Sequence, residues 1–174
     1  MPIYAPVFKA LSEAGISFLV IGGHAVVLHG HQRNTFDLDL LLAEAFLPNA
    51  KSALEPLGYT SYFESGAFLQ LTPRRGLPPL DIMIVDATTF QRLNQFTESR
   101  TFDGEQIRIP DAKRLVALKL HALKASTRTT RDKDWSDIVG IILAAQLDIE
   151  DPEFQDIVQT YGEPGAIAKI KRWL

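Results

Sequence analysis

Short apolar runs separated by polar, glycine-containing turns fill the chain up to Pro110. The runs "SFLVIG", "FDLDLLL" and "PPLDIMIVD" are rich in β-forming side chains and bounded by turn residues, which predicts buried strands. The segments "YTSYFES" and "AFLQLTP" predict a hairpin, and Asp103-Gly104 between two alternating segments predicts a second one. We therefore expect the first part of the chain to form a sheet.

Helical patterns lie between these runs. We expect a helix over residues 4–14, which Gly15 ends, and a short helix directly after Gly22-Gly23. Residues 45–57 place their leucines near one face, which predicts a third helix.

The pattern becomes mainly helical after Pro110. Asp111 can cap a helix, "AKRLVALKLHALKAS", and a polar loop, "TRTTRDKD", separates it from the helix "WSDIVGIILAAQ". Two short helices are expected over residues 151–161 and 163–174. The sequence thus predicts an α/β (α+β) protein in two parts, a sheet domain over residues 1–109 and a helical region over residues 110–174 packed on it.

Composition narrows the classes of function. The 174 residues are 46% hydrophobic, which is enough for a packed core. The formal net charge of −3 argues against a dedicated binder of duplex nucleic acid, although it leaves room for a local basic groove. The absence of cysteine excludes disulfides and cysteine-based zinc sites. The sequence shows neither a signal-peptide pattern nor an apolar run of membrane-spanning length, so we expect a cytoplasmic protein without a membrane partner.

Two acids interrupt an otherwise apolar strand. Asp37 and Asp39 are two apart in "FDLDLLL" and should share one face of the strand. Like charges that close repel unless a cation lies between them, although such pairs also occur at solvated strand ends. Asp81 in "LDIMIVD" could lie beside Asp39 if the two strands are neighbours. Three carboxylates on adjacent strands suit a two-metal phosphoryl-transfer site, with Mg²⁺ as the expected ion and Mn²⁺ as its alternative. Asp86 is a weaker candidate, which can instead cap the next helix.

Gly22-Gly23 connects a predicted strand to a helix. Glycine permits a tight turn and a close approach of the backbone to a ligand, and the following helix N-terminus suits a phosphate. A plain turn is the alternative, and a glycine pair alone more often marks one. The position of the pair, fourteen residues before Asp37, favours the phosphate interpretation.

The stretch "IGGHAVVLHGHQRNTFDLDLLL", together with Asp81, resembles the signature of the nucleotidyltransferase superfamily that shares the polymerase β palm. The order and spacing fit over residues 18–85. The version "GGHAV…HG…R.T.DLDLL" is similar to AbiEii-type and related small bacterial nucleotidyltransferases, some of which are toxins of toxin–antitoxin pairs. The resemblance implies a palm-like mixed sheet flanked by helices and followed by a C-terminal helical bundle. Gly23 departs from the pattern, because many active members have a serine there that helps to hold phosphate.

The resemblance extends to a "K…R.KD..D" block in the helical region. Carried over to this sequence, Lys119 would bind the nucleotide triphosphate, and Asp137 or Asp134 would support the site or position the acceptor. Taken by itself, a lysine on an apolar helix face needs an anion or reaches the surface. Arg33, just before the acidic strand, can pair with a carboxylate or contact an incoming phosphate.

The implied activity is metal-dependent transfer of NMP from an NTP to an acceptor hydroxyl. Asp37 and Asp39 would hold the metal, and Asp81 would complete the metal site and help to deprotonate the hydroxyl. Gly22, Gly23 and Lys119 would neutralise the phosphates. The expected acceptor is an RNA end, with tRNA as one candidate, or a protein, and a toxin would also have an antitoxin partner. The alternative is a catalytically decayed module of the same fold that binds a partner protein.

Overall fold

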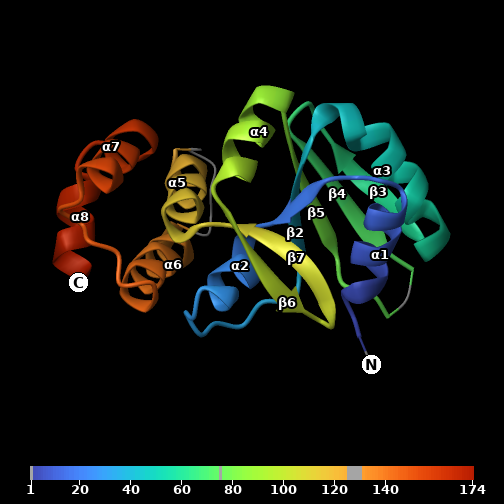
Figure 1. Ribbon diagram of the computed structural model, residues 1–174, viewed down its shortest axis with the longest axis horizontal. Coiled ribbons are helices and arrows are strands. Elements are labelled where there is room, and N and C mark those ends of the chain that lie inside the picture. The colour runs from blue at the N-terminus through green and yellow to red at the C-terminus, as the bar shows by residue number, and fades with distance from the viewer. Residues whose placement is uncertain (1, 75, 125–130) are drawn as a thin grey trace. The chain divides into compact units, whose positions relative to one another are not determined.

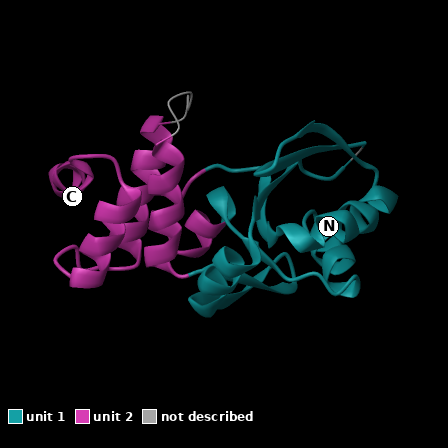
Figure 2. Cartoon of the chain, turned by 90° about the horizontal axis from the view of Figure 1, so that it is seen from above, with its two compact units in different colours: residues 1–24, 34–110 teal, residues 25–33, 111–174 magenta. Residues whose placement is uncertain are grey.

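The computed structural model describes residues 2–74, 76–124 and 131–174. The chain forms two compact units (Figure 2). Residues 1–24 and 34–110 form the first, and residues 25–33 and 111–174 form the second. The second unit therefore takes in a short segment from the first half of the sequence, in addition to the predicted helical region.

A mixed five-stranded sheet organises the first unit (Figure 1). Its order is β1-β2-β5-β4-β3, in which β2 and β5 are parallel and the other neighbours are antiparallel. This confirms the mixed sheet flanked by helices that the sequence predicted. The strands are β1 Phe18–Val20, β2 Leu38–Ala43, β3 Tyr59–Glu64, β4 Phe68–Pro73 and β5 Leu80–Val85.

The two central strands carry much of the core. Leu38, Leu40 and Leu42 of β2 are fully buried, as are Leu80 and Ile82 of β5. In β5 buried and partly exposed residues alternate, so one face of that strand packs in the core while the other remains partly open.

The predicted second hairpin is present as β6 (Thr97–Phe102) and β7 (Glu105–Pro110). Asp103 and Gly104 both have positive φ, 54° and 85°, as a two-residue hairpin turn with right-handed strand twist requires. The Asp103 carboxylate also accepts hydrogen bonds from the backbone N–H groups of Tyr4 (2.6 Å) and Ala5 (2.9 Å). It thereby caps the first helix, whose own N-cap residue, Tyr4, makes no side-chain capping bond.

Among the residues that the structure describes, four helices and two short 3₁₀ segments begin in the first unit. The segment predicted as one helix over residues 45–57 is divided, because the central helix is flanked by 3₁₀ turns and Pro56 lies in the second of them. Asp86 caps α4 by accepting a hydrogen bond from the Thr89 N–H at 2.9 Å. The bounds are α1 Ala5–Glu13, α2 Gly22–Leu28, η1 Glu44–Phe46, α3 Leu47–Leu54, η2 Glu55–Leu57 and α4 Ala87–Gln95.

The described residues of the second unit contain four further helices, α5 Ala112–Leu123, α6 Arg131–Ala144, α7 Pro152–Tyr161 and α8 Ala166–Trp173. The prediction of a polar loop over "TRTTRDKD" is wrong for its last four residues, because α6 already begins at Arg131. Asp132 and Asp134 in the first turn of α6 favour this start through the helix dipole. The rest of that segment lies outside the described residues. No helix in the described part of the chain is both long enough and apolar enough to span a membrane.

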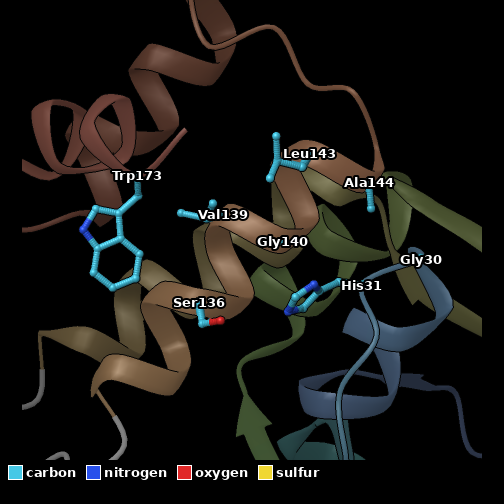
Figure 3. A pocket seen from close by; sticks show the side chains of 8 residues that line it. All are labelled: Gly30, His31, Ser136, Val139, Gly140, Leu143, Ala144 and Trp173. Carbon is cyan, nitrogen blue, oxygen red and sulfur yellow. The ribbon is translucent and has the colours of Figure 1, made fainter.

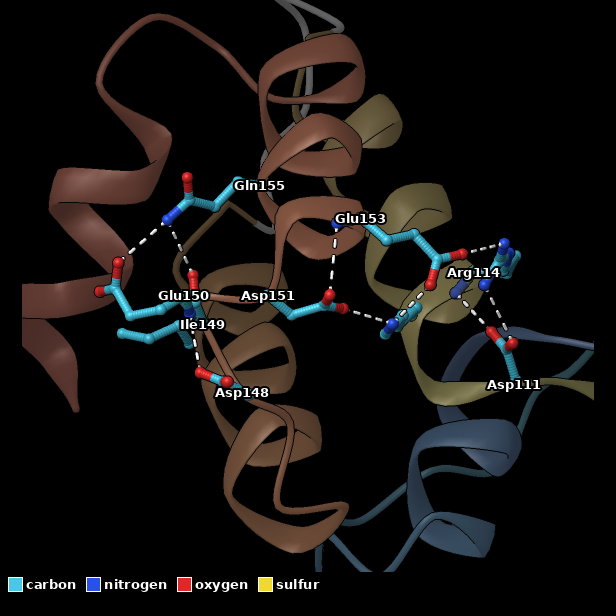
Figure 4. Close-up of polar contacts among 9 residues, drawn as sticks. Asp111, Arg114, Asp148, Ile149, Glu150, Asp151, Glu153 and Gln155 are labelled. Carbon is cyan, nitrogen blue, oxygen red and sulfur yellow. Dashed lines mark hydrogen bonds and ion pairs between the residues drawn. The ribbon is translucent and has the colours of Figure 1, made fainter.

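Ion pairs hold the start of α5 against α7 (Figure 4). Asp111 caps α5 through the Arg114 N–H at 2.8 Å, as the sequence predicted. The Arg114 guanidinium reaches Glu153 at 2.6 Å, and the Lys113 ammonium contacts both Asp151 and Glu153. Asp151 in turn caps α7, so the two helix starts are joined through shared side chains.

Replacing Asp103 should uncouple the hairpin turn from α1. We expect Asp103→Ala to lower the free energy of unfolding by about 1–3 kcal/mol, because it removes a cap and places alanine at positive φ. Asp103→Asn, which tolerates this φ and keeps an acceptor oxygen, should lose less than half as much. Urea denaturation measures both values, and equal losses would contradict the capping role.

Candidate active site

Two of the three predicted acids are adjacent in the sheet of the first unit. Asp39 of β2 and Asp81 of β5 are direct partners in the parallel register. Neighbouring strands lie about 4.8 Å apart, and register partners project from the same face. Both side chains are partly exposed, whereas Leu38, Leu40, Leu80 and Ile82 on either side of them are buried. The structure thus brings two carboxylates together on the open face of the sheet.

Asp37 lies one residue before β2 and is exposed. Burial raises the pKa of the Asp81 carboxyl, the hydrogen bond from Gln70 lowers it, and the negative charge of Asp37 raises it again, with a net upward shift. The charge of Asp37, just before β2, thus contributes to the raised pKa of Asp81.

Gly22 fits against the Asp39 carboxylate. Its φ is +60°, and a Cβ at this position would stand 2.0 Å from Oδ2 of Asp39. The backbone N–H of Gly23 donates to the same oxygen at 3.3 Å. Gly22 therefore has a structural reason, because only a residue without a side chain lets the turn pass this close to the acid.

Gln70 is a site residue that the sequence reasoning missed. Its side-chain amide donates to both oxygens of Asp81 at 3.2 Å. The register links Phe63 of β3, Gln70 of β4, Asp81 of β5 and Asp39 of β2 into one row across four strands. A signal was present in the sequence, since Gln70 is the polar residue between the buried Leu69 and Leu71.

The carboxylate oxygens of this site suit a hard cation whose remaining coordination positions are filled by a substrate. In the described parts of the chain, no three His, Asp or Glu side chains form a ready-made metal site. Mg²⁺ is usually held by one or two carboxylates together with waters and substrate phosphates, rather than by a complete protein cage. The oxygen ligands of Asp37, Asp39 and Asp81 match that preference, and Asp81, with its raised pKa, would gain from a nearby cation.

The other three predicted nucleotide-binding residues meet in the second unit. The Lys119 ammonium donates to Asp134 at 3.0 Å and to Asp137 at 2.6 Å, and Arg33 donates to Asp137 at 2.5 Å. The side chains of Lys119, Asp134 and Asp137 are buried. This network joins α5 to α6 and balances two positive with two negative charges, which is how buried ions are tolerated. A role for Arg33, Lys119 or Asp137 in nucleotide binding stays a prediction.

A cavity of about 430 Å³ opens in the second unit, beside α6 (Figure 3). Its lining includes His31, Ser136, Leu143 and Trp173, and none of the predicted site residues. Gly140 makes room for the His31 ring, because a Cβ there would stand 2.3 Å from the imidazole. Trp173 at this cavity is 45% exposed.

Comparison with solved structures identifies the fold. No family model and no curated protein matches the sequence. The crystal structure of ANT(2")-Ia in complex with adenylyl-2"-tobramycin superposes with a TM-score of 0.66 at 13% identity, covering 98% of this chain and 96% of that one. An antigenic nucleotidyltransferase-like protein from Paracoccidioides brasiliensis gives 0.58 at 16% identity, covering 97% and 90%. The lincosamide antibiotic adenylyltransferase LnuA with lincomycin bound gives 0.57 at 16% identity, covering 78% and 91%.

The protein therefore has the fold of the nucleotidyltransferase superfamily. At these identities the likeness concerns the fold alone. The closer similarity to AbiEii-type proteins stays a prediction from the sequence.

Gly22→Ala tests the contact with Asp39. We expect it to lower the free energy of unfolding by about 2–5 kcal/mol, because positive-φ strain adds to a collision with the carboxylate. Gly15→Ala is the matched control, since Gly15 has φ +70° and nothing within 4 Å of the added Cβ. It should lose only about 1–2 kcal/mol. Chemical denaturation compares the two, and equal losses would contradict the close approach.

Asp81 should make stability depend on pH in metal-free buffer. Its folded pKa is raised above the ordinary value of 3.8, so its protonated form favours the folded state. That contribution is complete below pH 3.8 and is lost as the pH rises through the folded pKa. Asp81→Asn should therefore be more stable than the wild type at pH 7, and the difference should shrink toward pH 4.

Asp86→Asn is the control for this pH dependence. The bonds from the Thr89 side chain and backbone lower the Asp86 pKa, so its contribution has the opposite sign and is lost as the pH falls. Denaturation of all three proteins between pH 4 and 8 measures the effect. A wild type more stable than Asp81→Asn at pH 7 would contradict it.

Proposed function

We propose that the protein is a Mg²⁺-dependent nucleotidyltransferase that moves NMP from an NTP to an acceptor hydroxyl. The observation that carries this proposal is the register pairing of Asp39 with Asp81 beside the Gly22-Gly23 turn. It occurs in a fold shared with solved nucleotidyltransferases. A pair of carboxylates and a tight glycine turn are the parts that positioning and charge neutralisation require in phosphoryl transfer.

The carboxylates would hold the metal and handle the proton. Asp37, Asp39 and Asp81 are the proposed ligands, and Mg²⁺, or Mn²⁺ in its place, would supply positive charge to the phosphates. Asp81, the register partner of Asp39, is the proposed acceptor of the proton from the attacking hydroxyl. The hydroxyl oxygen bonds to the α-phosphorus, and the bond from that phosphorus to pyrophosphate breaks. Gln70 orients Asp81 through both carboxylate oxygens.

The sequence resemblance names candidate nucleotide-binding residues in each unit, which are considered separately. The glycine turn is the proposed seat of the phosphates, and Lys119, Arg33 and Asp137 are the proposed helpers from the sequence resemblance. For Lys119 or Arg33 to contact phosphate directly, the ion network with Asp134 and Asp137 would have to rearrange. We therefore assign them an indirect role, in which they hold α5, α6 and the Arg33 segment in place.

The acceptor we propose is an RNA end, including that of tRNA, or a protein hydroxyl, as the sequence resemblance implies. In this proposal the protein acts as the toxin of a toxin–antitoxin pair, with an antitoxin as its partner. Two of the similar solved enzymes act on antibiotics, so a small-molecule hydroxyl belongs in any acceptor screen.

A decayed, partner-binding module is the second candidate. Two observations favour it, namely that the Gly23 amide already bonds to Asp39 and that Lys119 is already paired with two carboxylates. Neither group is then available to phosphate without rearrangement.

Asp39→Asn should separate the two candidates. With each α-labelled NTP, Mg²⁺ and total cell RNA or protein, the wild type should label an acceptor. Asp39→Asn should lose at least about a hundredfold in rate, because a neutral amide holds the metal poorly. Asp86→Asn, at an exposed helix cap, is the control and should label at the wild-type rate.

A second readout needs no acceptor. A working site should raise the melting temperature in the presence of Mg²⁺ and NTP together, because a ligand that binds only the folded state stabilises it. Wild-type labelling by Asp39→Asn, or no labelling and no thermal shift in the wild type, would refute the enzymatic role.

A further inference from the structure

Three large aromatic side chains lie exposed at the β3–β4 end of the sheet in the first unit. Tyr62 is 62% exposed, Phe63 49% and Phe68 45%. All residues of β3 after Tyr59 are exposed, and β3 is the last strand in the sheet order. Figure 1 shows β3, β4 and β5 next to one another at this end. Exposed aromatic groups gathered in one place often mark a binding surface.

The register places these aromatic side chains on the face that carries the acids. Phe63 is the partner of Gln70, Gln70 is the partner of Asp81, and register partners share a face. Phe68 is two residues before Gln70 in β4 and so projects from the same face. The row that begins at Asp39 thus ends in an aromatic surface, with Phe63 two strands, or about 10 Å, from Asp81.

Tyr62 occupies an irregularity in the edge strand. Ser61 pairs with Leu71 and Phe63 with Gln70, which leaves Tyr62 as the extra residue of a β-bulge. Bulges re-aim side chains and are frequent beside functional sites. Desolvation raises the pKa of Tyr62, and the negative charges of Asp81 and Asp37 contribute in the same direction.

The direction of the reaction decides which substrate this surface would meet. In phosphoryl transfer the attacking and leaving oxygens are roughly in line across the phosphorus. Under the proposed function, pyrophosphate leaves on the side of the Gly22-Gly23 turn, next to β2. The attacking hydroxyl then approaches from the opposite side, past Asp81 and toward Gln70 and Phe63.

The shape of the surface indicates the chemistry of the acceptor. Small molecules are usually enclosed in concave pockets, whereas unpaired bases of single-stranded RNA stack on open Tyr and Phe side chains. Tyr62 and Phe63 lie on the edge strand β3 and Phe68 on the neighbouring β4, and all three rings are exposed. Stacking is tolerant of base identity, because every base has a π-face.

We propose that Tyr62, Phe63 and Phe68 form an acceptor platform on which the 3′-terminal bases of single-stranded RNA stack while the terminal hydroxyl lies at Asp81. This inference rests on the proposed nucleotidyl transfer and specifies its acceptor. The platform would act in acceptor binding and leave the binding of NTP to the glycine-turn side of the row.

The test is NMP transfer to a short single-stranded RNA with a free 3′ hydroxyl, with kcat and KM measured for the RNA and for the NTP. Tyr62→Ala and Phe63→Ala should each raise the KM for RNA about 5- to 100-fold, as the loss of one stacking contact predicts. The KM for NTP should stay within about twofold. Tyr62→Phe, which keeps the ring, should behave as the wild type.

Phe96→Ala is a matched control, because Phe96 is 44% exposed but lies at the end of α4, outside the row. Fluorescence anisotropy of a labelled RNA gives a second readout, in which the platform variants should bind more weakly and Phe96→Ala should not.

Each alternative outcome has one meaning. Transfer to RNA with an unchanged KM in both alanine variants would overturn the platform and leave the proposed function standing. Transfer only to small molecules or to protein would also overturn the platform alone. Failure of the wild type to transfer NMP to any acceptor would overturn both.

Discussion

The parallel pairing of β2 with β5 is the constraint on which the rest of the first unit depends. It sets Asp39 opposite Asp81, and a shift of one residue would turn one of the two acids into the core. Buried leucine and isoleucine residues flank both acids along their strands, so the hydrophobic effect itself fixes the register that brings the carboxylates together. The glycine turn then contacts Asp39, and Gln70 contacts Asp81.

The two units treat their acidic groups in different ways. In the second unit, Asp134 and Asp137 are buried against Lys119 and Arg33, and the network is balanced in charge. In the first unit, Asp81 receives only the neutral amide of Gln70 as its side-chain donor among the described residues. The balanced network holds helices together. Asp81, by contrast, lies beside Asp39 and has a raised pKa, so a nearby positive charge would stabilise its ionised form. A partly buried carboxylate beside a second one lowers stability, and such pairs are typical of sites that bind cations or substrates.

Much of the fold could be predicted from the sequence, because the signals were local. Apolar runs marked the strands, Asp103-Gly104 marked the second hairpin, and Asp86 and Asp111 marked helix starts. What could not be predicted depended on pairing between distant segments. The sequence indicated that Lys119 needs an anionic partner, but its pairing with Asp134 and Asp137 depends on how α5 packs against α6. Gln70 and Phe63 can be placed in the row with Asp81 only once the strand order is known, and a single sequence does not reveal that order.

The cap on α1 also bears on the order in which the chain folds. The N–H of Ala5 bonds to a carboxylate 98 residues further along the sequence. During synthesis, α1 therefore leaves the ribosome long before the β6–β7 hairpin turn, which carries the carboxylate that caps it. Short helices gain most of their stability from tertiary partners. This cap of the N-terminal helix can therefore form only once the turn of the β6–β7 hairpin is in place.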